Sequence, residues 1–188
     1  KIREIRDLMS EDFQHIEILG LSDYDIGTIE ENGNSFSENA MIKSRTVSAY
    51  TGLPVLADDS GLCVHSLGGH PGIYSSRYSG RGDQGNIDKL LLEMLGTPKE
   101  KRGAYFECSI CYTDARGISH VFSGKAHGII AEKRKGCNGF GYDPVFYIPE
   151  IRKTMAELTP EEKNRISHRA HAIKDFLAFL SKNNTLSA

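Results

Sequence analysis

The chain has 188 residues, of which 39% are hydrophobic and 26% charged, and its formal net charge is −2. Its length suits one domain, and the nearly balanced charge excludes a broad electrostatic field for nucleic acid or anionic lipid. No apolar stretch approaches the roughly 20 residues that span a bilayer, and "KIREIRDLM" at the start lacks the apolar core of a secretion signal. We therefore expect a cytoplasmic protein without nucleic-acid or membrane partners.

The first part of the chain predicts two helices, each followed by a strand. Hydrophobic residues recur at helical spacing in "KIREIRDLM" (1–9), and "FQHIEILGL" (13–21) has the composition of a strand. A second helix is expected from Phe36 to Tyr50, because Gly52 suits its C-cap and Pro54 stops it. "PVLA" then predicts a short buried strand that ends at two adjacent aspartates.

The second part predicts a helix, a long hairpin and two further helices. Hydrophobic residues at helical spacing follow a Gly-rich stretch, namely Ile87, Leu90, Leu91 and Met94. The segment 103–130 alternates along two runs, which is typical of an antiparallel hairpin. Thr159, Pro160 and Glu162 form an N-cap, an N1 proline and a capping box. The last helix has a hydrophobic face formed by Ile173, Phe176, Leu177 and Leu180. These elements indicate one mixed α/β domain.

Two short motifs have ordinary explanations. "GRGDQG" matches the pattern GxGxxG through Gly80, Gly82 and Gly85. A dinucleotide fingerprint must follow a buried strand, whereas the polar "YSSRYS" precedes this motif, so we expect a flexible loop. Cys108 and Cys111 form a CxxC in a predicted strand, where positions three apart point to opposite faces. With no second close pair, we expect all four cysteines, Cys63, Cys108, Cys111 and Cys137, to be buried reduced thiols instead of a zinc site.

Asp58 and Asp59 in "ADDSGLCV" suggest either a turn or a metal site. The sequence Asp-Ser-Gly suits a type I turn. Glu38 also has a local explanation, because Ser35 and Glu38 are spaced as a capping box. A short connection from this helix to the next strand would nevertheless bring both regions to one edge of the sheet. Three carboxylates gathered there would suit Mg²⁺, which completes its octahedron with water and substrate phosphates.

A second candidate region lies in the last third of the chain. In "GFGYDP", glycines flank Phe140 and Tyr142, and Asp143 follows. Glycine lets an aromatic ring approach the backbone, and a carboxylate accepts hydrogen bonds from ring N–H groups. A Gly-rich turn with core aromatics is the alternative. Basic residues at a break between two helices would bind a base carbonyl or phosphate, or form a solvated face: Lys163, His168 and Arg169.

These residues resemble one known family, the non-canonical purine nucleoside triphosphate pyrophosphatases (inosine triphosphatase or RdgB-like). The resemblance runs through nearly the whole chain in "SFSENAMIKSR", "LPVLADDSGLCVHSLGGHPGIYSSRYSG", "GFGYDPVFY" and "KTMAELTPEEKNRISHR". It implies Mg²⁺-dependent hydrolysis of dITP, ITP or XTP to the monophosphate and pyrophosphate by a cytoplasmic homodimer. The implied fold is an elongated α/β domain of two lobes around a mixed sheet, with a deep central cleft.

The resemblance also implies roles for individual residues. Asp59 is similar to the family's proton acceptor and metal-site residue, Glu38 to a metal ligand and Ser60 to a substrate contact. Asp58 is a further implied metal-site residue, and Lys43 is a supporting residue. The implied base and substrate contacts are Phe140, Gly141, Tyr142, Asp143, Lys163, His168 and Arg169.

The start of the chain departs from the family pattern. The family opens with a strand and a Thr/Ser-x-Asn-x-x-Lys phosphate-binding loop, and "KIREI" resembles that lysine and the helix after it. Lys1 is therefore an implied triphosphate contact. We expect residues 1–188 to form a single domain that lacks the first strand and most of the phosphate loop. If that segment were truly absent, stability and activity would be low.

Two other functions fit part of the pattern. A Maf-like nucleotide pyrophosphatase has a related fold and also uses acids and a metal, but "GFGYDP" together with "SHR" favours the purine enzymes. A catalytically silent nucleotide sensor would keep the base pocket. The intact Glu38, Asp58 and Asp59 argue against a silent protein.

Overall fold

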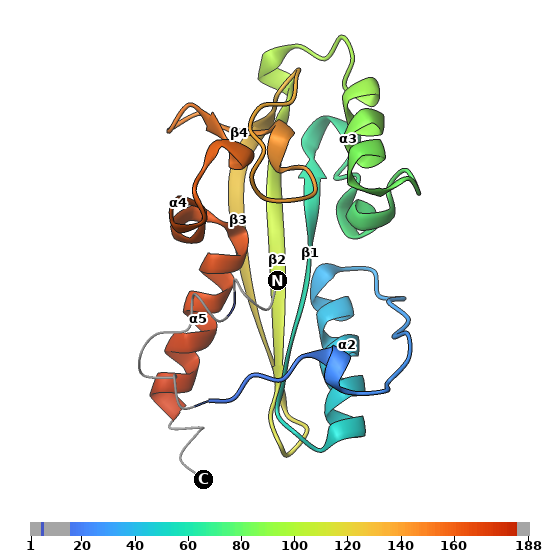
Figure 1. Ribbon diagram of the computed structural model, residues 1–188, viewed down its shortest axis with the longest axis vertical. Helices are drawn as coiled ribbons and strands as arrows, with labels where there is room; N and C mark the ends of the chain where they lie inside the picture. The colour runs from blue at the N-terminus through green and yellow to red at the C-terminus, as the bar shows by residue number, and fades with distance from the viewer. Residues whose placement is uncertain (1–4, 6–15, 184–188) are drawn as a thin grey trace. The chain divides into compact units, whose positions relative to one another are not determined.

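The structure is a computed structural model that describes Ile5 and residues 16–183 (Figure 1). Lys1 and nearly all of the expected first helix lie outside these residues. The strand predicted at 13–21 is wrong where the chain is described, because Ile16 is a bend and residues 17–20 have no regular secondary structure. A 3₁₀ turn follows at Leu21–Asp23, and the Asp23 carboxylate accepts the Gly20 N–H at 2.7 Å. This local hydrogen bond favours a turn at the end of the hydrophobic run.

Helix α2 (Phe36–Thr51) forms as the capping signals predict. The Ser35 hydroxyl accepts the Glu38 N–H, and Gly52 ends the helix in the left-handed conformation with φ 69°. Strand β1 (Val55–Val64) is longer than predicted. Asp58 and Asp59 therefore lie inside a strand, so neither the turn nor the strand end predicted for them is correct. Pairing within the sheet overrides the local turn preference of Asp-Ser-Gly here.

Five strands form one sheet in the order β1-β2-β3-β4-β5. The long strands β2 (Gly103–Thr113) and β3 (Ser119–Ile130) are the predicted hairpin. Two short strands, β4 (Phe146–Ile148) and β5 (Lys153–Thr154), pair antiparallel beyond β3. The predicted α/β class and hairpin are confirmed. The sheet of the described residues is antiparallel and not mixed, and the deep cleft stays a prediction.

The hairpin turn is fixed by Asp114. Its carboxylate accepts the backbone N–H groups of Arg116 and Ile118 at 2.9 Å each and pairs with the Arg116 guanidinium at 3.0 Å. These contacts, chiefly the Ile118 N–H, hold the pKa of Asp114 below its usual value.

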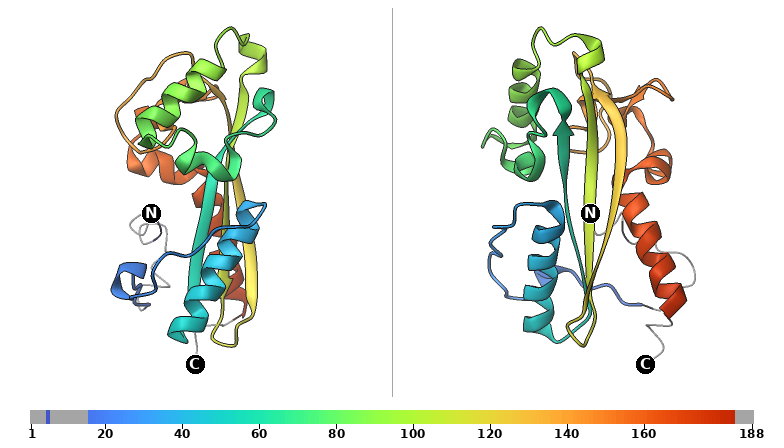
Figure 2. Two further views of the ribbon diagram at one scale, coloured as in Figure 1. Left: turned by 90° about the vertical axis from the view of Figure 1, so that its right-hand side faces the viewer. Right: turned by 180° about the vertical axis from the view of Figure 1, so that it is seen from behind.

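The described chain forms two compact units, and each of the three long strands contributes residues to both. Unit 1 contains the described residues up to Asp59, with Ser109–Gly124 and the chain from Arg169 onward. Unit 2 contains Ser60–Cys108 and Lys125–His168. Figures 1 and 2 show the three long strands side by side.

In unit 1, strand alternation assigns α2 and α5 (His168–Asn183) to opposite faces of the sheet. Side chains of α2 contact odd-numbered strand positions, because Ser44 bonds Cys111 and Thr113, and Arg45 bonds Ser119. Helix α5 contacts even-numbered positions through aromatic pairs that join Phe176 to Tyr112 and Phe122, and Phe179 to His120 and Phe122. The predicted hydrophobic face of the last helix is therefore confirmed.

In unit 2, α3 (Gly82–Glu93) packs Ile87 and Leu90 into a core with Leu62, Val64, Phe106 and Phe146. Gly82 and Gly85 lie in the first turns of this helix, so the flexible loop predicted for "GRGDQG" is wrong for most of the motif. Helix α4 (Pro160–Ile166) has the predicted capping box at Thr159 and Glu162.

The cysteines are free thiols, three of them buried and Cys137 exposed, so the prediction of burial is wrong for Cys137 alone. Across the described part of the chain, every helix is too short or too polar to cross a membrane.

Candidate functional site

Unit 1 holds a buried carboxylate, Asp59, between charged and polar side chains of α2. Asn39 and Lys43 are four positions apart on one face of the helix, so both reach the strand. Lys43 Nζ lies 2.9 Å from one Asp59 carboxylate oxygen, and Asn39 Nδ2 donates to the other at 3.3 Å. Glu31 is a second partner of Lys43, at 3.4 Å. The helix thus fixes the orientation of both carboxylate oxygens.

The environment of Asp59 shifts its proton affinity. Burial disfavours the charged carboxylate and raises the pKa of Asp59, while Lys43 and the Asn39 amide act in the opposite direction and Glu31 adds to the rise. Burial is the largest of these effects. Asp59 is therefore more basic than an ordinary aspartate and is still oriented by a cation, so it is suited to accept a proton.

Glu38 lies at the exposed start of α2 and has the local role that its spacing predicts. Its N–H donates to the Ser35 hydroxyl at 3.2 Å, which is one half of a capping box. The Glu38 carboxylate accepts the N–H of Asn34 at 2.7 Å, one residue further back than a standard box. This contact uses one carboxylate oxygen at the same helix start that presents Asn39.

Asp58 points to the other face of β1, because consecutive strand residues alternate. Its carboxylate lies 3.0 Å from Arg169 Nη2 on α5, and both side chains are nearly inaccessible. The structure therefore does not bring Asp58 to the side of the strand that carries Asp59. Lys43, by contrast, lies where a supporting residue for Asp59 was expected.

The metal prediction can be compared with this geometry. Among the described residues, no three His, Cys, Asp or Glu side chains are arranged to hold a metal ion. Mg²⁺ needs fewer protein ligands, because it is usually held by one or two carboxylates together with water and substrate phosphates. Asp59, with the exposed Glu38 at the start of the adjacent helix, fits that requirement in donor type.

Unit 2 contains the second candidate region, the aromatic loop formed by residues 139–143. The Asp143 carboxylate accepts the Phe140 N–H at 3.0 Å and pairs with Lys163 Nζ at 2.6 Å. Lys163 Nζ also lies 4.8 Å from the centre of the Phe140 ring, which is about half exposed. The loop thus presents an accessible aromatic face with a cation beside it.

Tyr142 anchors the aromatic loop in the core. Its side chain is buried, and its hydroxyl donates to the Ser75 carbonyl at 2.9 Å. Burial raises the pKa of Tyr142, so the phenol remains a neutral hydrogen-bond donor at physiological pH. Tyr142 therefore acts first as a packing residue.

Gly139 permits the position of Asp143. Its φ is +76°, and a Cβ at Gly139 would overlap an Asp143 carboxylate oxygen. Any side chain there would displace the acid from Lys163. Glycine is thus required on two counts, conformation and space.

The remaining predicted contacts lie on β1 and at the break between α4 and α5. Ser60 follows Asp59 in β1 and is partly buried. His168 is buried and stacks on Phe106, with ring centres 4.9 Å apart. The predicted break is confirmed, because Ser167 separates the two helices.

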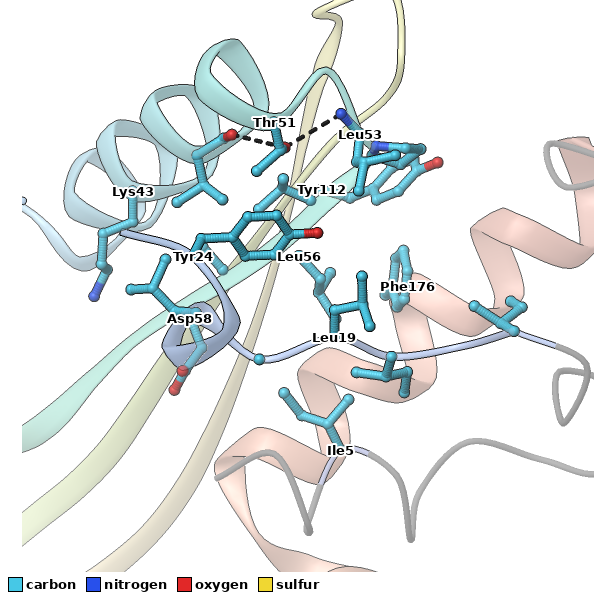
Figure 3. Close-up of a pocket in the computed structure, with 18 of the residues that line it drawn as sticks. Ile5, Leu19, Tyr24, Lys43, Thr51, Leu53, Leu56, Asp58, Tyr112 and Phe176 are labelled. Carbon is cyan, nitrogen blue, oxygen red and sulfur yellow. Dashed lines mark hydrogen bonds between the residues drawn. The ribbon is translucent and has the colours of Figure 1, made fainter. Parts of the chain in front are cut away.

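A cavity of about 650 Å³ in unit 1 is lined mainly by aliphatic and aromatic side chains. Figure 3 shows Lys43 and Asp58 at one end, and Tyr112 and Phe176 at the other. Among its described lining residues Lys43 is the single cation. A triphosphate needs several cations or N–H donors, so this cavity is not assigned to a nucleotide.

Sequence reasoning missed Asn39, Glu31 and Asp83, which contacts the aromatic loop. Asn39 is completely buried, as are its neighbours in the helix Phe36 and Ala40. A polar residue on the hydrophobic face of a helix could have indicated a functional role for Asn39. Asp83 accepts the Gly141 N–H at 2.9 Å. No local pattern predicts that contact, because the two residues are 58 positions apart.

Comparison with known proteins gives consistent matches. The sequence profile of the Ham1 family matches residues 1–179. The dITP/XTP pyrophosphatase of Yersinia pseudotuberculosis is 46% identical over 180 residues, which covers 93% of this chain and 89% of that protein. That of Halalkalibacterium halodurans is 49% identical over 160 residues, covering 84% and 82% respectively. A solved HAM1 protein from Coxiella burnetii has a TM-score of 0.88 at 38% identity, covering 96% of this chain and 93% of its own.

Proposed function

This chain belongs to the Ham1 family, and we propose that it hydrolyses the non-canonical purine nucleotides dITP, ITP and XTP to the monophosphate and pyrophosphate, with Mg²⁺. The observation that carries the proposal is the buried Asp59 carboxylate, held by Lys43 and Asn39 in a chain 46% identical to a dITP/XTP pyrophosphatase. This arrangement supplies an oriented proton acceptor.

Cleavage of the bond between the α and β phosphates needs a nucleophilic water and a group that takes its proton. We assign the proton acceptor to Asp59, whose pKa is raised by burial. Lys43 and Asn39 hold its two oxygens, so the carboxylate does not need to reorient during the reaction. Asp59 and Glu38 would hold the Mg²⁺, which when bound offsets phosphate charge and acidifies water.

We assign purine stacking to the aromatic loop of unit 2. The exposed Phe140 ring suits stacking on a purine, and Asp143 with Lys163 provides an acceptor and a donor beside it. The family resemblance implies Arg169 as a base contact, and in unit 1 its guanidinium is held by Asp58. As a base contact, its donors would match a 6-oxo group and oppose the 6-amino group of adenine. Discrimination of roughly 10⁴ is attainable by such a pattern. Adenine would be rejected because its 6-amino group would leave the donors of Arg169 without an acceptor.

The cytoplasmic location and the homodimer belong to the same proposal. A nucleotide-pool enzyme works where nucleoside triphosphates are used, which supports the location. The family resemblance supports the dimer, and sedimentation of the purified protein measures it directly.

Pyrophosphate release from dITP, XTP, dTTP and ATP, with and without Mg²⁺, tests the function. We expect turnover of dITP and XTP that requires Mg²⁺, with ATP and dTTP far slower. Preferential turnover of dTTP would support a Maf-like enzyme instead. Tight binding of dITP without turnover would support a nucleotide sensor.

The Asp59→Asn variant tests the assigned proton acceptor. We expect kcat for dITP to fall by about 10²–10⁴, because general-base catalysis is lost while the side-chain volume stays the same. The exposed Asp175→Asn on α5 is the matched control and should retain full activity. An unfolded Asp59→Asn protein, judged by circular dichroism, would mean that the residue is structural.

A further inference from the structure

The start of helix α3 is joined to the aromatic loop by a hydrogen bond that connects distant parts of unit 2. Asp83, the second residue of α3, accepts the backbone N–H of Gly141 at 2.9 Å. Gly141 lies directly after the exposed Phe140 and has φ +58°. The acceptor is a carboxylate oxygen, and the bond lies at an exposed position.

Two other amides of the loop, those of Phe140 and Asp143, are satisfied within the loop itself. The Phe140 N–H donates to the Asp143 carboxylate at 3.0 Å, and the Asp143 N–H donates to the Phe140 carbonyl at 3.3 Å. The Gly141 N–H instead points out of the loop to Asp83. Asp83 therefore supplies an external restraint at the residue that follows the aromatic ring.

The start of α3 is itself rigidly attached. The buried Asn86 accepts hydrogen bonds from the Ser79 N–H and hydroxyl at 2.7 and 2.8 Å and donates to the Ser75 carbonyl at 3.2 Å. That same carbonyl accepts the Tyr142 hydroxyl at 2.9 Å. Ser75 thus connects α3 and the aromatic loop a second time.

We propose that Asp83 is a positioning residue for purine binding: by holding the Gly141 amide, it keeps the Phe140 ring in the orientation that stacks on the base. This role rests on the proposed function, in which Phe140 contacts the purine. It also gives "GRGDQG" a purpose other than dinucleotide binding, because the motif starts the helix that carries Asp83.

Steady-state kinetics with dITP test the role. We expect Asp83→Ala to raise KM about 5- to 20-fold while kcat stays within about twofold, because loss of one charge-assisted hydrogen bond loosens binding and leaves Asp59 intact. Asp83→Asn retains an acceptor oxygen and should recover most of the affinity. Gln84→Ala, at the adjacent exposed position, is the matched control and should behave as wild type. An unchanged KM in Asp83→Ala, or Asp83→Asn no better than Asp83→Ala, overturns the proposal.

Hydrogen exchange of the peptide 138–145 gives a readout without substrate. We expect the Gly141 amide to exchange about tenfold faster in Asp83→Ala than in wild type or Gln84→Ala, and unchanged exchange overturns the proposal. Wild-type turnover of dITP with an unaltered KM in Asp83→Ala would overturn the positioning role alone. Absence of wild-type turnover would overturn the proposed function and, with it, the role of Asp83 in purine binding.

Discussion

Asp58 and Asp59 are adjacent in the sequence and pair with different cations, Arg169 and Lys43. Alternation along β1 sends Asp59 to Asn39 and Lys43 on α2, and Asp58 to Arg169 on α5. Asp59 remains a carboxyl whose pKa is raised by burial. Asp58 forms a buried ion pair with Arg169, whose side chain is only 2% exposed. The first arrangement suits proton transfer, and the second suits structural support.

The buried ion pair of Asp58 and Arg169 should contribute strongly to the stability of the protein. Arg169→Ala and Asp58→Ala should each lower the free energy of unfolding by about 3–5 kcal/mol, because each leaves a buried charge without this partner. The double variant should lose clearly less than the sum of the two single losses. Urea unfolding of the four proteins measures this coupling.

The half-exposed ion pair of Lys153 and Glu162 is the control for this double-mutant cycle. The coupling energy of this pair should be at most about 1 kcal/mol, because solvent screens an exposed pair; the Glu162 variant additionally loses its capping-box contact with Thr159. Additive losses at Asp58 and Arg169 would mean that the two side chains are stabilised by other neighbours, and would leave Arg169 available chiefly for the nucleotide.

At the scale of elements, the conformation of the aromatic loop depends on the absence of a side chain at Gly139. Gly139 leaves space for the Asp143 carboxylate, which in turn holds Lys163 and the Phe140 N–H. Asp143 is almost fully buried, so its charge depends on Lys163 for compensation. A small backbone change in this loop would therefore weaken the buried ion pair between Asp143 and Lys163.

Gly139→Ala should disrupt this arrangement, and Gly141→Ala is its matched control. Both glycines have positive φ, but a Cβ at Gly141 has no neighbour within 4 Å, whereas one at Gly139 would overlap the Asp143 carboxylate. We expect Gly139→Ala to raise KM for dITP at least tenfold and Gly141→Ala to have a smaller effect, because only the first displaces Asp143 as well as straining the backbone. Equal effects in steady-state kinetics would show that strain alone matters.

Elements with local signals could be predicted from the sequence. The caps of α2 and α4 and the hairpin around Asp114 follow from residues within a few positions of one another. The length of β1 could not be predicted, because Asp-Ser-Gly favours a turn until pairing with β2 extends it. The same holds for residues 17–20, which have a strand-like composition but no regular secondary structure.

The residues of the candidate site could be predicted from the sequence, but their arrangement in space could not. The sequence and its family resemblance pointed to Asp59 and Lys43, and the structure places them 2.9 Å apart. The separation of Asp58 from Asp59 depends on the strand continuing through both residues. The contact from Asp83 to Gly141 depends on the packing of α3, which no motif spacing encodes.

At the scale of the whole molecule, the three long strands are shared by the two units. The unit boundary falls between Asp59 and Ser60 in β1, between Cys108 and Ser109 in β2, and between Gly124 and Lys125 in β3. Each unit has its own hydrophobic core, one around Phe176 and the other around Phe146. Unfolding either core therefore removes packing from half of the same three strands.

We predict that the protein unfolds in one cooperative transition. Phe176→Ala and Phe146→Ala should each lower the free energy of unfolding by about 3–5 kcal/mol, although they weaken different cores. Because three continuous strands join the units, each variant should shift the whole transition, and near-ultraviolet and far-ultraviolet circular dichroism should coincide. Two separate transitions, with each variant shifting only one, would show that the strands do not couple the cores. In that case Asp59 with its partners Lys43 and Asn39, and the aromatic loop, would belong to independently stable parts of the chain.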